Sequence, residues 1–238
     1  MQSEANSFAR RAQLTEWMDE PCAYAEFRAC LLDLMQVNRT VLSYRPTLRW
    51  LENFTASGVL PLHIVDTGSG AGDMLRRIEA WAQRRSMAVR LTGIDANPHA
   101  ARAACEFTDA GSTIEWITCE ASNYKPAARI DIVISSLFTH HLADAEIVSY
   151  LQWMERTASR GWFINDLRRA RLPYYMFKLL ARCMRWHRFV RHDGPISIQR
   201  SFTEADWRAY AQHAGLDAGA LRIVGAWPGR LCVGRVKA

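Results

Sequence analysis

The stretch Leu62-His63-Ile64-Val65-Asp66-Thr67-Gly68-Ser69-Gly70-Ala71-Gly72 decides the fold. An apolar run ends in an acidic residue, and three glycines follow at alternate positions. Glycine allows the chain to turn sharply out of a strand, and it allows a ligand to approach bare backbone. The segment that follows, from Asp73, has apolar side chains at helical spacing. The stretch therefore predicts a buried strand, a ligand-binding turn and a helix.

From here the chain alternates between strand and helix patterns. Apolar runs predict strands at 62–65, 89–94, 113–118, 130–135 and 161–165, with helices at 73–85, 97–110 and 144–156 between them. This alternation is typical of a doubly wound parallel sheet with right-handed crossovers. A capped helix from Thr203 to Gly215 and two closing strands, 221–226 and 231–236, follow. We therefore predict an α/β fold with a mostly parallel seven-stranded sheet whose last strand is antiparallel.

Two segments outside this alternation are predicted to be helical. Residues 1–58 form an N-terminal helical cap, with helices at 23–35, 37–44 and 48–54. The cap is either a layer over one edge of the sheet or a lid over the glycine turn, since ligands of such sheets bind at the carboxyl ends of the strands. Residues 166–202 are too long for a plain connection and form a helical insertion or lid. The chain, 1–238, is expected to be a single domain.

The positive charge of the chain is concentrated in this insertion. The formal net charge is +6, whereas residues 168–200 hold nine Lys and Arg against one acid, Asp193, which leaves −2 for the rest. A local patch of this kind argues against nucleic acid as a partner. Residues 174–190 predict an amphipathic helix with a basic row at Lys178, Arg182 and Arg185. Residues 172–191 could cover a hydrophobic acceptor, touch an anionic membrane surface, or pack on the domain with the arginines in solvent.

The composition is that of a soluble globular protein, with 49% hydrophobic and 23% charged residues. The six cysteines are scattered without Cys-x-x-Cys or zinc spacing, so we expect reduced thiols in a cytoplasmic protein. Residues 1–11 lack the apolar core of a signal peptide, and no apolar run is long enough to span a membrane. The sequence does not predict an oligomeric state.

The glycine spacing distinguishes two kinds of cofactor site. The pattern Asp-x-Gly-x-Gly-x-Gly at 66–72 differs from the G-x-G-x-x-G fingerprint of dinucleotide-binding folds, which argues against a nicotinamide cofactor. It resembles the first motif of class I S-adenosylmethionine-dependent methyltransferases. The resemblance covers about residues 60–235. It implies a Rossmann-like methyltransferase fold, methyl transfer as the activity and S-adenosyl-L-methionine as the cofactor.

The carboxyl ends of the predicted strands supply candidate cofactor ligands. The glycines allow backbone amides to approach the methionine end of the cofactor, and Asp66 orients the turn. Asp95 ends the second strand, where a carboxylate can accept hydrogen bonds from both ribose hydroxyls or, alternatively, cap the next helix. The resemblance places Glu120 and Ala121 against the adenine, with a plain surface position as the alternative for Glu120. The predicted cofactor-binding residues are Asp66, Gly68, Ser69, Gly70, Gly72, Asp95, Ala96, Asn97, Glu120, Ala121 and Ser135.

The predicted catalytic residues are His140, His141 and Asp166. Two histidines follow the fourth strand, and histidine titrates near neutrality, so one of them can remove a proton from a phenol or alcohol during methyl transfer. The alternative is that one histidine lies in the core or caps a helix while the other lies at the surface. If one of the two histidines is the base, we favour His141. Asp166 ends the fifth strand, where it could orient a histidine, hold a substrate hydroxyl or cap the next segment. No metal is expected, because a metal-dependent catechol-type site would need several carboxylates at the mouth where the methyl group is presented, and only Asp166 is placed there.

Further motifs give a narrower resemblance. They are 37–39, 93–98, 135–142, 162–168, 193–197 and 200–202 together with the glycine turn. The combination resembles a group of bacterial methyltransferases associated with type III polyketide synthases, which implies O-methylation of phenolic products such as alkylresorcinols. Methylation of carbon in an aromatic or quinone precursor, or cofactor binding without catalysis, are the alternatives. The predicted acceptor-binding residues are Tyr44, Arg45, Phe138, Arg168, Tyr174 and Tyr175.

Overall fold

The computed structural model of this protein describes residues 8–55 and 61–237. The predicted boundary of the N-terminal cap at residue 58, and most of the polar segment 1–11, lie outside the described residues. Seven strands form one sheet in the order β3-β2-β1-β4-β5-β7-β6. Their bounds are β1 Leu62–Thr67, β2 Val89–Asp95, β3 Glu115–Thr118, β4 Ile132–Ser136, β5 Gly161–Leu167, β6 Arg222–Ala226 and β7 Arg230–Val236. The first five strands pair in parallel and β7 is antiparallel to both of its neighbours, as predicted.

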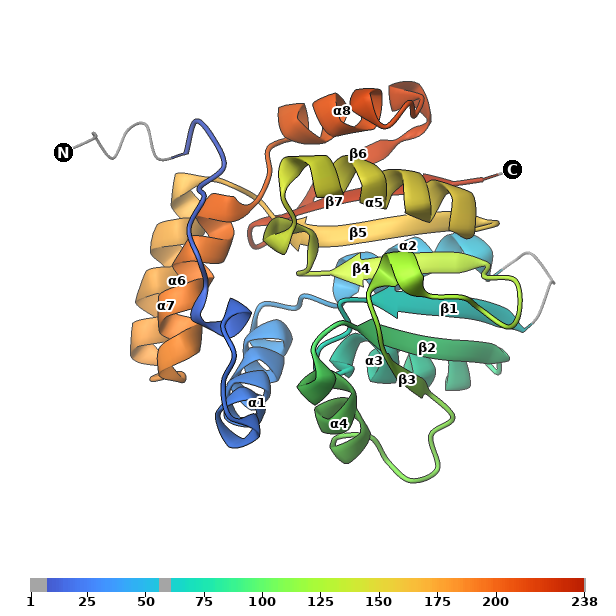
Figure 1. Cartoon of the computed structure of the whole chain (residues 1–238), viewed down its shortest axis with the longest axis horizontal. Coiled ribbons are helices and arrows are strands. Elements are labelled where there is room, and N and C mark those ends of the chain that lie inside the picture. The colour runs from blue at the N-terminus through green and yellow to red at the C-terminus, as the bar shows by residue number, and fades with distance from the viewer. Residues whose placement is uncertain (1–7, 56–60, 238) are drawn as a thin grey trace.

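Helices cover both faces of the sheet (Figure 1). Successive side chains of a strand point to opposite faces, so both faces are apolar along the central strands. Ile64 of β1 packs with α2 (Arg45–Leu51) and α3 (Asp73–Gln83), while Val65 packs with α5 (Asp144–Thr157) and α8 (Glu204–His213). The remaining helix of the alternating part is α4, Pro98–Glu106, with Asn97 as its N-cap. The sheet therefore holds the carboxyl ends of β1, β2, β4 and β5 at one edge.

Three helices lie beyond that edge (Figure 1). They are α1 (Tyr24–Thr40), α6 (Arg171–Cys183) and α7 (Arg188–Arg200). One small core joins them, built from Cys30 and Val37 of α1, Ala181 of α6, and Phe189 and Val190 of α7. Of the N-terminal helices, α1 lines the same cavity as the glycine turn, whereas α2 packs on the sheet.

The helix boundaries in these segments differ from the predicted ones. The predicted helices at 23–35 and 37–44 are one continuous helix, α1, which runs to Thr40. The predicted helix at 174–190 is wrong, because the chain breaks between α6 and α7. Arg185, two residues after the end of α6, adopts a left-handed conformation (φ 54°), and Trp186 turns into the core shared with α1. Burial of that ring outweighs the local preference for a continuous helix.

We call α1, α6 and α7 the lid helices. The first described residues form an extended segment along one of them, α7. We call residues 8–20 the N-terminal strap; it contains the short 3₁₀ helix η2 (Trp17–Asp19). Its backbone bonds to α7 in three places: Ala12 N to Gln199 O, and the amides of Trp17 and Met18 to the carboxylate of Asp193. All six cysteines are unpaired. Among the described helices, none has the length and apolar character needed to cross a membrane.

Candidate active site

A cavity of about 600 Å³ lies between the carboxyl edge of the sheet and the lid helices. Asp66, Gly68 and Gly70 of the glycine turn line it together with Asp95 and Asn97 after β2. His140 and His141 line it from the loop after β4. Most of the remaining lining is apolar and comes from α1, α6 and α7. The cavity thus has a polar part at the sheet and an apolar part at the lid.

The three glycines of the turn have different roles. All three have positive φ, which L side chains rarely adopt. A Cβ on Gly68 would lie 2.5 Å from the ring of Phe138, and one on Gly72 would collide with the ring of Trp116. A Cβ on Gly70, in contrast, would have only Leu31 Cδ2 nearby, at 4.0 Å. Gly70 therefore presents bare backbone to the cavity, whereas the other two glycines make room for aromatic rings.

Two carboxylates flank this bare backbone. Asp95 Oδ2 accepts a hydrogen bond from Gly70 N at 2.8 Å, and its Oδ1 accepts one from Asn97 N at 2.9 Å, so Asp95 fixes the turn. Asp66 is fully buried, and burial together with the charges of Asp73 and Asp95 raises its pKa well above the ordinary value. Its Oδ1 has no hydrogen-bond partner among the described residues. Because buried polar atoms are normally paired, this oxygen suits a ligand that brings a hydrogen-bond donor.

Asp166 holds His140 in a fixed orientation. His140 Nδ1 lies 2.7 Å from Asp166 Oδ1, and the other carboxylate oxygen accepts bonds from Thr139 Oγ1 (2.5 Å) and His140 N (3.1 Å). Burial would raise the pKa of Asp166, but the charge of His140 and these hydrogen bonds outweigh it and hold the pKa well below its usual range. A carboxylate only accepts, so Nδ1 carries the hydrogen and Nε2 of a neutral His140 is left as a base.

The second histidine has a more open environment. His141 is half-buried, and its Nδ1 lies 2.8 Å from Asp19 Oδ1 of the N-terminal strap. The two imidazole rings lie 4.2 Å apart. Arg200 of α7 bonds to the backbone oxygens of both histidines, and Arg11 of the strap bonds to that of His140. The strap and α7 therefore fix the loop on which the histidines lie.

Glu16 of the strap lies beside the two histidines. The sequence did not predict Glu16 as a site residue. It is buried; its Oε1 lies 3.9 Å from His140 Nε2 and 3.3 Å from Arg200 Nη1. Burial raises the pKa of Glu16 to about 7, although the charges of His141 and Arg200 act in the opposite direction. Glu16 lies in a polar segment without periodicity, more than 120 residues from the histidines, so no sequence pattern links it to them.

Glu16, His140 and His141 are also the described residues that could hold a metal ion. One ligand atom from each lies within 4.8 Å of the others. The guanidinium of Arg200 already places a positive charge there, at 3.3 Å from Glu16 and 2.6 Å from Asp19 Oδ2. A bound cation would have to share these carboxylates with Arg200, so the arrangement suits proton transfer better than metal binding.

The structure brings part of the predicted site to the cavity. The predicted residues that line it are Asp66, Gly68, Gly70, Asp95, Asn97, His140, His141, Tyr44 and Phe138. The predicted residues outside its lining are Ser69, Gly72, Ala96, Glu120, Ala121, Ser135, Arg45, Asp166, Arg168, Tyr174 and Tyr175. Ser136, rather than Ser135, reaches the cavity, and Glu120 is exposed. Cofactor or acceptor contacts by both groups remain predictions.

The central part of the chain is similar to a known protein family. Residues 64–161 match the model of a family described as "Methyltransferase domain". The match spans β1 to the start of β5, which includes the glycine turn, Asp95 and both histidines. No curated protein matches the chain in sequence.

Solved structures of methyltransferases share the fold of most of the chain. The plantazolicin methyltransferase BpumL, in complex with SAH, has a TM-score of 0.61 at 15% identity and covers 90% of this chain and 95% of its own. Magnesium protoporphyrin IX methyltransferase from Synechocystis PCC 6803, with bound SAH, has a TM-score of 0.56 at 14% identity over 98% and 93%. Human N-acetylserotonin methyltransferase, in complex with SAM, has a TM-score of 0.64 at 14% identity over 91% and 57%. At these identities the likeness concerns the fold.

Proposed function

We propose that this protein is an S-adenosylmethionine-dependent methyltransferase that methylates a hydroxyl of a small hydrophobic acceptor, phenolic or derived from a polyketide. The observation that carries this proposal is the His140–Asp166 pair. It gives the cavity a buried, oriented base that faces the same space as the open backbone of Gly70. The match of residues 64–161 to a methyltransferase domain and the shared fold support the cofactor.

The polar part of the cavity fits the amino-acid and ribose groups of this cofactor. The unpartnered Oδ1 of Asp66 suits the ammonium group, and the positive N-terminal end of α3, which follows the glycine turn, suits the carboxylate. Asp95 keeps lone pairs beyond its two backbone bonds, which suit the ribose hydroxyls. When bound, S-adenosylmethionine supplies an electrophilic methyl group on its sulfonium.

The chain's own residues then position the acceptor and remove its proton. Leu31 and Leu34 of α1 with Met176, Phe177 and Leu180 of α6 form an apolar wall that excludes water and binds the body of the acceptor. His140 Nε2 takes the hydroxyl proton as the oxygen attacks, which increases the nucleophilicity of that oxygen. Asp166 remains ionised and stabilises the imidazolium that forms.

A labelled-methyl assay tests this proposal. The protein is incubated with methyl-¹³C S-adenosylmethionine and a panel of phenols that includes alkylresorcinols, and the products are characterised by mass spectrometry and NMR. We expect a labelled methyl ether. A methyl group on ring carbon without an ether would favour C-methylation. Cofactor binding in calorimetry without turnover of any acceptor would favour a binding protein.

A further inference from the structure

We propose that α6 and the turn between β6 and β7 form a docking face that seats this protein on an anionic lipid bilayer, with the mouth of the cavity toward the lipid. We define the docking face as Leu172, Tyr175, Met176 and Leu179 of α6 together with Trp227. The inference goes beyond the proposed methyl transfer, because it concerns where the protein binds and not what it catalyses.

The apolar side chains of α6 form an exposed stripe. Residues 172, 175, 176 and 179 follow the spacing i, i+3, i+4 and i+7, which places them on one side of a helix. Leu172 is 71% exposed and Leu179 is 66% exposed. The opposite side of α6 is packed, with Ala181 buried in the core shared with α1 and α7. The inward side of α6 is therefore covered by α1 and α7, whereas its outward apolar side is exposed to solvent.

Trp227 extends this stripe beyond the helix. It lies in the turn between β6 and β7 and is 80% exposed. The same turn packs against the first turn of α6, because a Cβ on Gly229 would lie 2.8 Å from Pro173. An exposed tryptophan beside exposed leucines is the side-chain composition that binds the boundary between headgroups and acyl chains.

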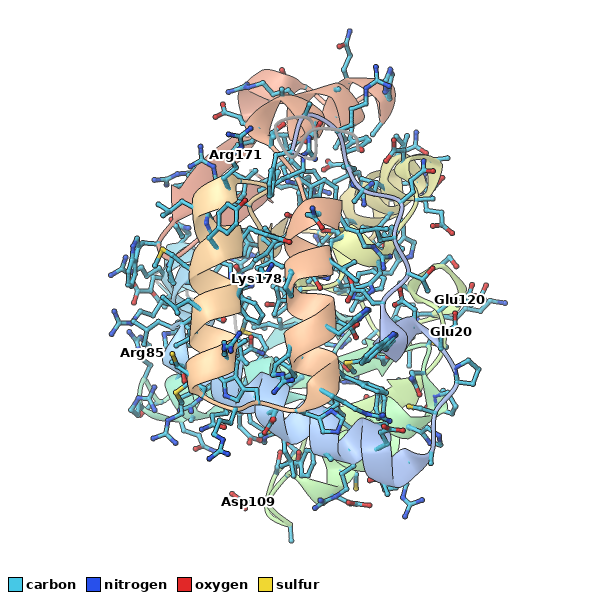
Figure 2. All side chains as sticks on the ribbon, turned by 90° about the vertical axis from the view of Figure 1, so that its left-hand side faces the viewer. Glu20, Arg85, Asp109, Glu120, Arg171 and Lys178 are labelled. Atoms are coloured by element: carbon cyan, nitrogen blue, oxygen red, sulfur yellow. The ribbon has the colours of Figure 1, made fainter. Side chains whose placement is uncertain are left out.

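A basic row runs beside the stripe. Of the nine Lys and Arg between residues 168 and 200, seven are exposed: Arg168, Arg171, Lys178, Arg182, Arg185, Arg188 and Arg191. Arg171, Lys178 and Arg182 lie about a quarter turn around α6 from the apolar stripe, at 100° per residue. Figure 2 looks onto this side of the molecule, where Arg171 and Lys178 both project from α6.

The positive charge of the basic row indicates that the docking face binds anionic lipid. An apolar stripe flanked by Lys and Arg matches an interface of anionic headgroups above acyl chains, where each basic side chain adds attraction. The row has the sign that a lipid phosphate complements. It contains no acidic residue between Arg168 and Arg191 that would repel such a surface.

The docking face is continuous with the cavity. Leu172, Met176 and Trp227 are exposed and also line the cavity, so they form its rim. The apolar stripe lies between two other sides of α6. On one flank of the stripe Phe177 and Leu180 face the cavity, and on the other flank lies the basic row. Docking through this face turns the mouth of the cavity toward the bilayer. A hydrophobic acceptor could then enter from the lipid without crossing water.

Vesicle sedimentation tests the proposal without any acceptor or cofactor, so its outcome is independent of the proposed methyl transfer. The full chain is mixed with vesicles of phosphatidylcholine alone, or with 30% phosphatidylglycerol as a roughly physiological anionic share. We expect binding to the anionic vesicles that weakens at high salt. Leu179→Glu, which does not line the cavity, should lower the partition coefficient at least about tenfold. The double variant Lys178→Gln/Arg182→Gln should lower it by a similar factor on anionic vesicles only.

Leu32→Glu is the matched control. Leu32 is an exposed leucine on α1, but it lies beside Arg76 and Arg77 of α3, away from α6. It should bind like the unmodified protein, and circular dichroism should show all three variants folded. The proposal is overturned if the unmodified protein does not bind anionic vesicles or if Leu179→Glu binds equally well. It is also overturned if Leu179→Glu instead abolishes a concentration-dependent dimer, because the face would then be an interface between copies.

Discussion

His140 and His141 are neighbours in sequence, yet their surroundings differ. Only His140 is both buried and held by Asp166. We expect His140→Ala to lower kcat by roughly 10²- to 10⁴-fold, the usual contribution of a general base, with little change in cofactor affinity. His141→Ala should have a much smaller effect. Steady-state kinetics and calorimetry with S-adenosylmethionine measure both quantities. Equal rates for the two variants would remove His140 from the role of base.

Glu16 gives the protein a specific pH dependence of stability. Its pKa rises from 4.5 to about 7 on folding, so protons bind Glu16 more tightly in the folded state. The stabilisation from neutral Glu16 is therefore complete below about pH 4.5, declines as pH rises, and is lost above about pH 7. Its size is about 3 kcal/mol, since one pKa unit corresponds to about 1.4 kcal/mol.

The variant Glu16→Gln tests this dependence. The free energy of unfolding of the unmodified protein, relative to Glu16→Gln, should fall by about 3 kcal/mol between pH 4.5 and 8. Urea unfolding at several pH values measures it. Glu20→Gln is the control, because Glu20 is exposed on the same strap (Figure 2). If both variants show the same pH profile as the unmodified protein, Glu16 does not change its proton affinity on folding.

For single residues, the sequence predicted which ones lie at the cavity better than it predicted what each one does there. Asp66, Gly70, Asp95 and both histidines reach the cavity because strand ends can be located from apolar periodicity, and parallel strands bring those ends together. The separate tasks of the three glycines depend on Trp116 and Phe138, whose rings approach only in the folded chain. Contacts of this kind, across long separations, leave no local pattern.

The helices of the lid depend on one buried ring. Trp186 lies between α6 and α7 and packs with residues of α1 in their common core. We expect Trp186→Ala to lower the free energy of unfolding by about 3–5 kcal/mol, the usual cost of removing a large buried aromatic side chain. Trp227→Ala, at an 80% exposed position, should change it by less than about 0.5 kcal/mol. Urea unfolding of both variants measures the difference. Similar losses would mean that the lid does not depend on this core.

The same helices show why local signals mislead. Residues 184–187, Met-Arg-Trp-His, contain neither Gly nor Pro, so nothing in the sequence marks the break there. Gly194 and Pro195, which usually mark a break, lie inside α7. A Cβ on Gly194 would collide with Phe177 of α6, so this glycine serves close helix packing. Tertiary packing decides both positions.

The whole molecule should be stabilised by its cofactor whatever the acceptor is. At a concentration of about 100 times Kd, a ligand that binds only the folded state adds about 2.7 kcal/mol. For a chain of this size that corresponds to an increase in Tm of roughly 5–10 °C. Nicotinamide dinucleotides should have no effect, because the glycine spacing differs from theirs. Differential scanning fluorimetry measures both shifts, and an equal shift with NAD would contradict the cofactor assignment.

Two glycine variants make this test specific. Gly70→Val should lose the shift, since the valine methyls enter the cavity and its positive φ disfavours a side chain. Gly111→Val should keep it, because a Cβ on Gly111 has no atom within 4 Å. The mostly parallel seven-stranded sheet was predicted from the sequence, since alternating strand and helix patterns admit few arrangements, but the order of its strands was not predicted.

The N-terminal strap also determines when the site can be complete during synthesis. The ribosome makes Glu16 and Asp19 well before Arg200, which forms ion pairs with both. At about 5–20 residues per second, several seconds or more separate the strap from α7. The nascent strap lacks these partners until α7 has been made. A truncated chain that ends before α7 would retain the glycine turn and both histidines, yet its histidine loop would lack Arg200. Assembly of the proposed site is thus coupled to the synthesis of α7.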